Sequence, residues 1–588
     1  MKRMLARPPL LRPLLKRYAG SYLLGLLTLF IVDYVNLFIP QLMGDVTDGL
    51  AAHTMDAAGV WTMAVQIVLC GVVVAVGRFF WRYFLIGTSR KIEREMRNRM
   101  FEKLETLSQR YYHAHKTGDL MSYFTNDLEA VRQAIGPEIV SSFDAVVLTI
   151  MVLYRMMTYV SVELTLWCLI PMGIIAVFGY FFGQTVERRY LGMQRAFAAL
   201  SDRVQESLSG ERIIKAFVQE DREAAAFRKV NEDKRRATME VVKLEVSFRP
   251  LLRLLVGVTV VIAIVVGGRL TMIGAMTLGK FVAFNMYIGS LVWPMLALGD
   301  SITYISQGIA GMNRIHEIFD EKPDITDAAE LDAVTELRGG IDVSHVSFAF
   351  REDLRESLHD LNLHVEPGET LAVMGRTGSG KTALVSLLTR TYDIQHGSIS
   401  FDGHDIKRIP LRLLRESIAY VPQDNFLFSN TLANNISFGR LDATREDIVK
   451  AAVAADIHDN IMDFPEQYDT MVGERGVTLS GGQKQRSSIA RALLKDSPIM
   501  ILDDSLSAVD TDTEETILRN LKETRAGKTT IMIAHRVSTV VNADHILVLD
   551  EGRTVEYGTP AELMAIEGGV FRTMVEKQRL ERQLALVD

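Results

Sequence analysis

Eight consecutive residues in the second half of this 588-residue chain have the types and spacing needed to bind a phosphate chain. They are Gly375, Arg376, Thr377, Gly378, Ser379, Gly380, Lys381 and Thr382. The glycines let backbone N–H groups curl around phosphates, and the helix expected from Ala383 onward adds positive potential. Lys381 has the reach for the β- and γ-phosphates, while the Thr382 hydroxyl can ligate Mg²⁺. The apolar run 371–374 before them completes a strand–loop–helix unit, so this Walker A pattern predicts a nucleotide site that includes Ala383.

A pair of acids at the end of an apolar strand predicts the metal side of the same site. Residues 499–502 are Ile, Met, Ile and Leu, and they lead directly into Asp503 and Asp504. A strand of this kind delivers a carboxylate to a nucleotide-bound metal ion, and Asp503 is placed for that role. Two adjacent acids could also form a solvated turn, but the apolar approach favours a Walker B motif. ATP and Mg²⁺ are therefore the expected cofactors.

Five residues between these two motifs resemble the signature of the ATP-binding cassette (ABC) family. They are Leu479, Ser480, Gly481, Gly482 and Gln483. This pattern is far more specific than Walker A alone, and other positions match the family as well. Gln423 resembles the Q-loop glutamine that touches Mg²⁺, His535 resembles the switch histidine at the γ-phosphate, and Phe350 stands where an aromatic ring stacks on adenine. The family's D-loop corresponds to Ser507, Ala508 and Asp510.

The resemblance covers the whole chain and implies an exporter half-transporter. In this family ATP is held between Walker A of one cassette and the signature of another, so a second half-transporter chain is the implied partner. Closing the two cassettes on ATP turns the membrane cavity outward, and hydrolysis resets it. The resemblance implies an ATPase of the type I exporter class, with Asp504, His535 and Gln423 as catalytic residues. Its cargo is expected to be amphipathic small molecules, drugs or lipids.

Asp504 departs from the family pattern, which has Glu after the Walker B aspartate. Aspartate is one methylene shorter, and a misplacement of about 1 Å costs on the order of 100-fold in rate, roughly 2.7 kcal/mol of barrier. The site built on this chain's Walker motifs is therefore expected to bind ATP well and hydrolyse it slowly. Because the signature is intact, the chain can complete a competent site on a partner. This asymmetry favours a heterodimer with one degenerate site; a homodimeric lipid flippase and an ATP-regulated membrane protein remain alternatives.

The apolar segments in the first half of the chain predict a domain that crosses a membrane. Mean hydropathy is positive at +0.13 although 23% of residues are charged, a combination typical of a membrane domain fused to a soluble one. A bilayer core of about 30 Å needs roughly 20 mostly apolar residues in a helix. Six segments qualify: 20–42, 60–87, 139–160, 163–183, 250–273 and 279–304. The fold expected is a six-helix membrane domain with long intracellular helices, followed by an α/β P-loop cassette.

Charge in the connections predicts the orientation. Residues 44–59 contain three aspartates and no Lys or Arg, whereas the connections 89–138 and 184–249 are long and dense in both charges. By the positive-inside rule the long connections, both termini and the cassette are cytoplasmic, in a multi-pass protein of a bacterial-type inner membrane. The expected layout is a cytosolic N-terminal segment 1–19, a membrane domain 20–305, a linker 306–338, a nucleotide-binding domain 339–575 and a tail 576–588.

Other features exclude functions or leave them open. A net charge of -7 gives no basic footprint for nucleic acid, and a pair of cysteines, Cys70 and Cys168, supports no disulfide framework. A Tyr- and His-rich stretch at 111–115 is expected to pack rather than bind metal, because no third ligand is apparent. Charged or polar side chains inside the spans either line a substrate path or snorkel to an interface. These are Asp33, Asn36, Arg78, Arg82, Asp144, Arg155 and Arg253.

Overall fold

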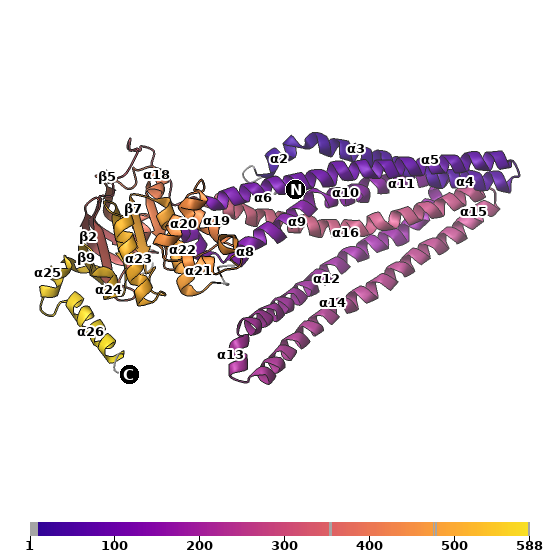
Figure 1. Cartoon of the computed structure of the whole chain (residues 1–588). Helices are drawn as coiled ribbons and strands as arrows, with labels where there is room; N and C mark the ends of the chain where they lie inside the picture. The colour runs from indigo at the N-terminus through magenta and orange to yellow at the C-terminus, as the bar shows by residue number, and fades with distance from the viewer. Residues whose placement is uncertain (1–9, 352–354, 474–475, 477–478, 586–588) are drawn as a thin grey trace. The chain divides into compact units, whose positions relative to one another are not determined.

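The computed structural model describes residues 10–351, 355–473, 476 and 479–585. They form two compact units, one of Met1–Glu105 and Thr117–Glu321, the other of Thr106–Lys116 and Lys322–Asp588 (Figure 1). The short segment 106–116 thus groups with the cassette, although it lies within the predicted membrane domain 20–305. Residues 1–9 of the predicted N-terminal segment and 586–588 of the predicted tail lie outside the described residues.

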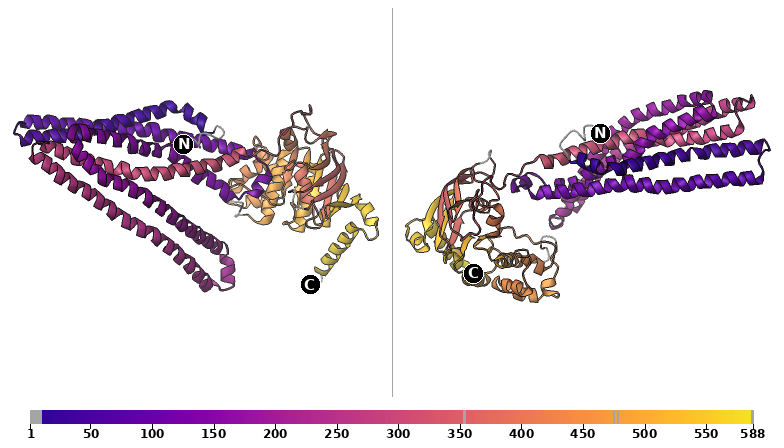
Figure 2. Two further views of the ribbon diagram at one scale, coloured as in Figure 1. Left: turned by 180° about the vertical axis from the view of Figure 1, so that it is seen from behind. Right: turned by 90° about the horizontal axis from the view of Figure 1, so that it is seen from above.

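The described residues of the first unit form helices joined by short turns, with no strand among them. Its helices are α2 (Leu11–Arg17), α3 (Ala19–Asn36), α4 (Phe38–Ala51), α5 (Ala57–Trp81), η1 (Arg82–Ile86), α6 (Gly87–Glu105), α8 (Thr117–Ser122), η2 (Tyr123–Asp127), α9 (Leu128–Ile135), α10 (Pro137–Phe143), η3 (Asp144–Leu148), α11 (Thr149–Arg155), η4 (Met156–Val160), α12 (Val162–Ser209), α13 (Glu211–Ala216), α14 (Glu220–Ile262), η5 (Ala263–Gly267), α15 (Gly268–Met272) and α16 (Leu278–Asp320). The η elements of this unit are single π-helical turns that continue the flanking α-helices. The helices α12 and α14 lie side by side as a long hairpin closed by α13 (Figure 2).

Long apolar helices account for much of the predicted membrane domain. Among the described residues, four helical stretches are long and apolar enough to cross a bilayer: Ala19–Ala51, Ala57–Glu105, Thr117–Val160 and Glu220–Met272. A shorter apolar stretch, Val162–Ile175, begins the long helix α12. These stretches overlap five of the six predicted spans, and α16 carries the segment predicted as the sixth. The number of spans stays a prediction.

Two of these helices meet at a pair of glycines. A Cβ atom on Gly279 would lie 1.9 Å from the Gly44 carbonyl oxygen, so α4 and α16 can approach only with glycine there. One turn further along α4, Asp48 accepts hydrogen bonds from the Gly279 N–H (2.6 Å) and the Thr277 hydroxyl (2.5 Å). A carboxylate at a helix N-terminus is favourable because the first N–H groups have no partner within the helix. The acidic connection predicted from residue 44 therefore begins as helix, and Asp48 caps α16.

The second unit is the α/β domain expected from the alternating pattern of its sequence. Its elements are α7 (Gln109–Ala114), β1 (Ile341–Phe348), β2 (Leu358–Val365), β3 (Thr370–Gly375), α17 (Lys381–Leu388), β4 (His396–Phe401), β5 (His404–Asp405), α18 (Leu411–Glu416), β6 (Ile418–Val421), α19 (Leu432–Ser437), α20 (Arg445–Ala454), α21 (His458–Met462), η6 (Gln467–Asp469), α22 (Gly481–Lys495), β7 (Ile499–Asp503), α23 (Thr511–Thr524), β8 (Thr529–Ile533), α24 (Val537–Val540), β9 (His545–Asp550), β10 (Arg553–Gly558), α25 (Pro560–Ala565) and α26 (Val570–Ala585).

Two sheets organise this unit. One has the order β10-β9-β3-β8-β7-β6, with every neighbouring pair parallel except β10 with β9; the other is antiparallel, in the order β2-β1-β4-β5. Strands β7 and β8 are buried along their whole length, as expected when helices cover both faces of a parallel sheet. In such sheets ligands bind beyond the carboxyl ends of the strands. Here the carboxyl ends of β3, β8 and β7 lie next to one another, and the segments that follow them carry the predicted nucleotide-site residues.

Candidate nucleotide site

The turn after β3 has the shape of a phosphate-binding loop. Gly378 and Gly380 adopt left-handed φ values of 83° and 100°, and a Cβ on Gly380 would lie 2.4 Å from the Ser357 carbonyl oxygen. Helix α17 starts directly afterwards at Lys381, so its free N–H groups face this loop. Two side chains of the loop are poised for a phosphate. The Lys381 ammonium donates to the Gly375 and Arg376 carbonyl oxygens, each at 2.9 Å. The buried Ser379 hydroxyl has no hydrogen-bond partner among the described residues. A triphosphate fits these donors.

The two acids lie at the end of β7, beside the loop. Asp503 pairs in register with Ile533 of β8 and is 2% exposed. Burial raises the pKa of Asp503 to about 6, and the neighbouring charge of Asp504 adds to this rise, whereas the Tyr420 hydroxyl and Lys381 lower it. A buried carboxylate in this setting suits a bound cation, and Mg²⁺ prefers such oxygen ligands. Asp504 follows with a left-handed φ of 47°, its N–H donating to the Ile533 carbonyl oxygen at 3.0 Å.

His535 stands two residues after β8 and shares this edge of the sheet with Asp504. Burial is the main cause of a lowered pKa for its imidazole; Lys381 lowers it further, and Asp504 opposes the shift. The ring is therefore neutral at pH 7 and retains one N–H to donate. Lys381 also has a lowered pKa, because burial outweighs the attraction of Asp504 and Asp503. The structure thus brings Lys381, Asp503, Asp504 and His535 together, as a γ-phosphate and its metal would require.

The signature forms the start of helix α22. Ser480 caps the 15-residue helix α22: its hydroxyl accepts from the Gln483 N–H at 3.3 Å, and the Gln483 side chain accepts from the Ser480 N–H at 3.0 Å. In the described part of the chain, no hydrogen bond or ion pair joins residues 479–483 to residues 375–383. The N–H groups at the start of α22, from Gly481 and Gly482, are therefore not used by this chain's own phosphate loop.

Gln423 and Phe350 occupy the edges of the site. Gln423 follows β6, next to β7, and is exposed; among the described residues it forms no hydrogen bond with Asp503. Its predicted part in metal binding stays a prediction. The half-buried ring of Phe350 packs edge-to-face on Phe348 and on Tyr392, with ring centroids 5.1 and 5.2 Å apart. Phe350 also lines a cavity of about 220 Å³ together with Ser108, Arg110 and Asp324.

The segment 106–116 contacts this aromatic cluster. The Tyr392 hydroxyl lies 2.9 Å from His113 Nδ1, and the His115 ring stacks on Tyr111 with centroids 4.1 Å apart. Both histidines of the Tyr- and His-rich stretch therefore have packing partners. Among the described residues no group of three or more His, Cys, Asp or Glu could hold a metal ion.

Hydrogen bonds join the D-loop to residues 535–537, here called the switch segment. The side chains that form them were not identified by the motifs. Gln485 of α22 accepts from the Ala508 N–H at 2.9 Å and donates to the Ser507 hydroxyl at 3.2 Å. Arg536 donates to the carbonyl oxygens of Ser507 and Val509, each at 3.2 Å, and to buried Glu514 at 2.6 Å. Asp510 caps α23 by accepting from the Thr513 N–H at 3.0 Å. Only the adjacency of Arg536 to His535 and of Gln485 to the signature could have suggested these residues.

Replacing Glu514 with glutamine is expected to destabilise the cassette. The Glu514 carboxylate, 1% exposed, binds the Arg536 guanidinium and the hydroxyls of Ser538 and Thr539. Glutamine removes the charge that balances Arg536, at an expected loss of about 1.5–3 kcal/mol in the free energy of unfolding. Thermal unfolding of the full chain would measure this. The adjacent, exposed Glu515→Gln is the matched control, and equal melting temperatures for the two variants would contradict the prediction.

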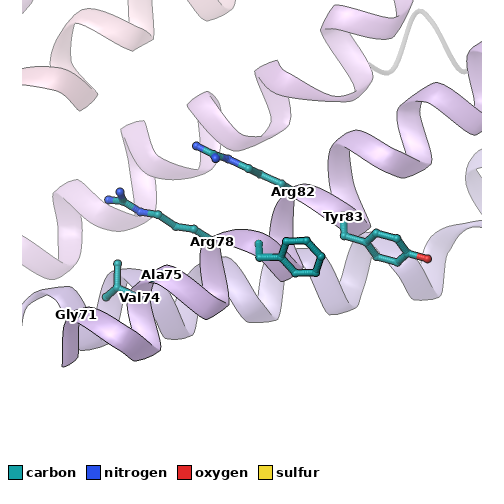
Figure 3. A pocket seen from close by; sticks show the side chains of 7 residues that line it. Gly71, Val74, Ala75, Arg78, Arg82 and Tyr83 are labelled. Atoms are coloured by element: carbon teal, nitrogen blue, oxygen red, sulfur yellow. The ribbon is translucent and has the colours of Figure 1, made fainter. Parts of the chain in front are cut away.

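Polar side chains in the membrane domain divide into two groups. Arg78 of α5 and Arg82 of η1 line a largely open pocket of about 610 Å³ along one helix, whose surface is otherwise apolar or aromatic, and both guanidinium groups extend from the same side of the helix (Figure 3). The pocket is completed by Gly71, Val74, Ala75, Phe79 and Tyr83. Arg155 is packed differently, with its guanidinium 4.8 Å from the Phe38 ring centroid and 3.4 Å from Gln41 Oε1. Pocket lining and local packing therefore both occur within the predicted polar set.

Comparison with known proteins agrees with this architecture. Residues 22–295 match the model of the ABC transporter transmembrane region, and residues 358–507 match the ABC transporter model. The chain is 38% identical over 566 residues to the probable multidrug resistance ABC transporter ATP-binding/permease protein YheI of Bacillus subtilis, covering 96% of each chain. It is 38% identical over 569 residues to the multidrug resistance-like ATP-binding protein MdlA of Escherichia coli, covering 97% of this chain and 95% of MdlA.

A lipid transporter and a solved structure extend the similarity. The chain is 35% identical over 498 residues to the ATP-dependent lipid A-core flippase of Syntrophus aciditrophicus, covering 84% of this chain and 82% of the flippase. Its fold superposes on a bacterial Atm1-family ABC exporter with ATP bound, with a TM-score of 0.78 at 28% identity, covering 96% of this chain and 99% of the other. The chain therefore belongs to the ABC transporter family, as a type I exporter in which a helical membrane domain is fused to a cassette that couples ATP hydrolysis to transport.

Proposed function

We propose that this chain is one half of an exporter that moves amphipathic small molecules, drugs or lipids out of the cytoplasm or the inner leaflet. The similarity to multidrug resistance proteins and to a lipid A-core flippase supports this cargo class. The open pocket along α5 and η1 is consistent with it, because two guanidinium groups on an apolar surface suit a molecule with both polar and apolar parts. The chain is placed in the inner membrane with both termini and the cassette cytoplasmic, and the domain limits predicted from the sequence are retained.

The proposed ATP site uses this chain's residues as follows. The loop 375–380, Lys381 and the N–H groups of α17 hold the phosphates; Thr382, Asp503 and Gln423 hold Mg²⁺. The neutral His535 imidazole donates to the γ-phosphate, and Asp504 orients the attacking water. Bound ATP with Mg²⁺ supplies the binding energy that favours the closed pair of cassettes over the open one. Ser480, Gly481 and Gly482 close on the nucleotide of the partner, which fits the lack of hydrogen bonds between residues 479–483 and the phosphate loop in the described part of the chain.

We further propose a heterodimer in which this chain's own site is the slow one. The single observation that carries this proposal is Asp504, which lies beside Lys381 and His535 where the family has glutamate. The intact signature would still serve a faster site on the partner. A homodimeric flippase is the second candidate, favoured by the similarity to the lipid A-core flippase.

Two experiments test these proposals. Inside-out vesicles that contain this chain and its partner are expected to accumulate an amphipathic cationic or anionic dye when ATP is added, and vesicles with Lys381→Ala are not. Normal ATPase activity without movement of any dye would favour an ATP-regulated membrane protein instead. Separately, the purified chain alone is expected to turn over ATP slowly, so robust turnover by the isolated protein would overturn the heterodimer.

A further inference from the structure

The C-terminal helix α26 is fastened to the cassette near its start. Glu556 of β10 accepts hydrogen bonds from the Val570 N–H (2.5 Å) and the Phe571 N–H (2.9 Å), which are the first donors of the helix. Phe571 is 1% exposed and packs in a hydrophobic cluster that includes Ala534 and Val540, on either side of the switch histidine. A carboxylate on the first N–H groups and a buried aromatic ring together fix the start of the helix. The tail predicted from residue 576 is thus the continuation of an anchored helix.

Two turns further along α26, a side chain of the helix forms hydrogen bonds with the backbone of the switch segment. The Gln578 side chain accepts from the Val537 N–H at 2.8 Å and donates to the His535 carbonyl oxygen at 2.6 Å. The orientation of the amide is fixed, since a backbone N–H can only donate and a carbonyl can only accept. Gln578 therefore holds the peptide groups on both sides of Arg536, although it lies 43 residues from His535 in sequence.

The opposite side of this segment is held as well. Arg536 binds the D-loop carbonyls of Ser507 and Val509 and the buried Glu514 carboxylate. The backbone that carries His535 is thus fastened between the D-loop and α26. In the described part of the chain the His535 ring itself makes no hydrogen bond, so the position of the imidazole depends on these backbone contacts.

We propose that Gln578 is a positioning residue for the switch histidine, and that α26 sets how well this chain recognises a γ-phosphate. The proposal rests on the role given above to His535. A hydrogen-bond donor is effective only when it is held in place before the charge arrives. Without Gln578, the peptide groups at His535 and Val537 lose their partners, and the ring samples more positions. Recognition of the adenine, the α-phosphate and the β-phosphate does not involve this segment, so ADP binding is unaffected.

The test compares a nucleotide that has a γ-phosphate with one that lacks it, in the full-length protein assembled with its partner. Gln578→Met keeps the length of the side chain and removes both hydrogen bonds. Affinity of this chain's site for the Mg²⁺ complex of AMP-PNP is expected to fall about 5- to 10-fold, while affinity for ADP changes by less than about twofold. The matched control is Arg579→Met, at an exposed position on the same helix, which leaves both affinities unchanged.

A double-mutant cycle separates this proposal from the role of His535. His535→Ala is expected to lower AMP-PNP affinity selectively, and adding Gln578→Met to it is expected to produce little further loss. If His535→Ala acts selectively but Gln578→Met does not, the positioning role of Gln578 is wrong while the proposed site stands. If His535→Ala leaves the ratio of the two affinities unchanged, both fail. An equal loss of AMP-PNP and ADP affinity in Gln578→Met would show a general structural role and would also overturn the proposal.

Discussion

Substituting Asp504 with glutamate is expected to raise ATP hydrolysis at this chain's own Walker site by about 10- to 100-fold. On the proposed role of Asp504, the extra methylene of glutamate would bring the carboxylate about 1 Å closer to the water that attacks the γ-phosphate. The left-handed φ of 47° at this position is energetically less favourable for glutamate than for aspartate. This difference lowers the free energy of unfolding and does not raise the barrier to hydrolysis. The expected gain is therefore in turnover.

The measurement must isolate the site in question. Steady-state ATPase activity is compared for the assembled pair in which the partner's own Walker B carboxylate has been substituted, so that hydrolysis reports on Asp504 alone. Asp504→Asn is the control: it has nearly the same size but no negative charge, and it should abolish the residual activity. Unchanged turnover in Asp504→Glu would remove the argument for two unequal sites and would leave the homodimer as the better interpretation.

Lys381→Ala is expected to weaken ATP binding at this site by at least about 100-fold, because charge-assisted hydrogen bonds to phosphate are worth about 1.5–3 kcal/mol each. The same change should not destabilise the protein. Burial lowers the pKa of Lys381, so the folded state disfavours the ammonium relative to the unfolded state, and this reduces stability below the usual lysine pKa. Removing the charge relieves that penalty, although it leaves space that the aliphatic stem filled.

Two readouts on the same sample check this prediction. Equilibrium binding of a fluorescent ATP analogue reports the affinity, and thermal unfolding without nucleotide reports the stability. Lys495→Ala is a matched control, since Lys495 is also a partly buried lysine with a lowered pKa that donates to backbone carbonyls, but it lies away from the phosphate loop. If the loss in free energy of unfolding caused by Lys381→Ala equalled its loss in ATP-binding free energy, the lysine would be structural rather than a phosphate ligand.

The sequence alone predicted those parts of the site in which a strand and the turn after it carry the functional residues. Walker A and the acids at 503 and 504 each follow an apolar strand, and local pattern alone places them at the carboxyl ends of β3 and β7. Similarity to the family supplied His535 and the signature, which have no comparable local pattern. The cassette fold and its fusion to a helical membrane domain are confirmed by the comparisons, while the roles of individual residues stay proposals.

The supporting contacts could not be predicted because they join residues far apart in the chain. Gln578 and His535 are 43 residues apart, and Tyr392 and His113 are 279 apart. Glutamine and tyrosine are common surface residues, so neither type marks a partner in advance. Asp48 was similarly assigned to an acidic connection, although it caps the first turn of α16. Such contacts follow from tertiary packing, which a single sequence does not encode as a spacing.

The length of strand β7 is fixed, because the number of its residues decides which acid lies at the metal side of the nucleotide site. Its side chains point alternately to the two faces of the sheet, and its register pairs Asp503 with Ile533 at the last position. Deleting Ile499, with Pro498 held in place, would move Asp504 into the place of Asp503 and turn every later side chain of the strand to the opposite face. The turn before β7 is constrained as well, because Ser497 is buried and its carbonyl oxygen accepts from the buried Arg525 guanidinium. Variation in length among working relatives should therefore fall outside both the strand and this turn.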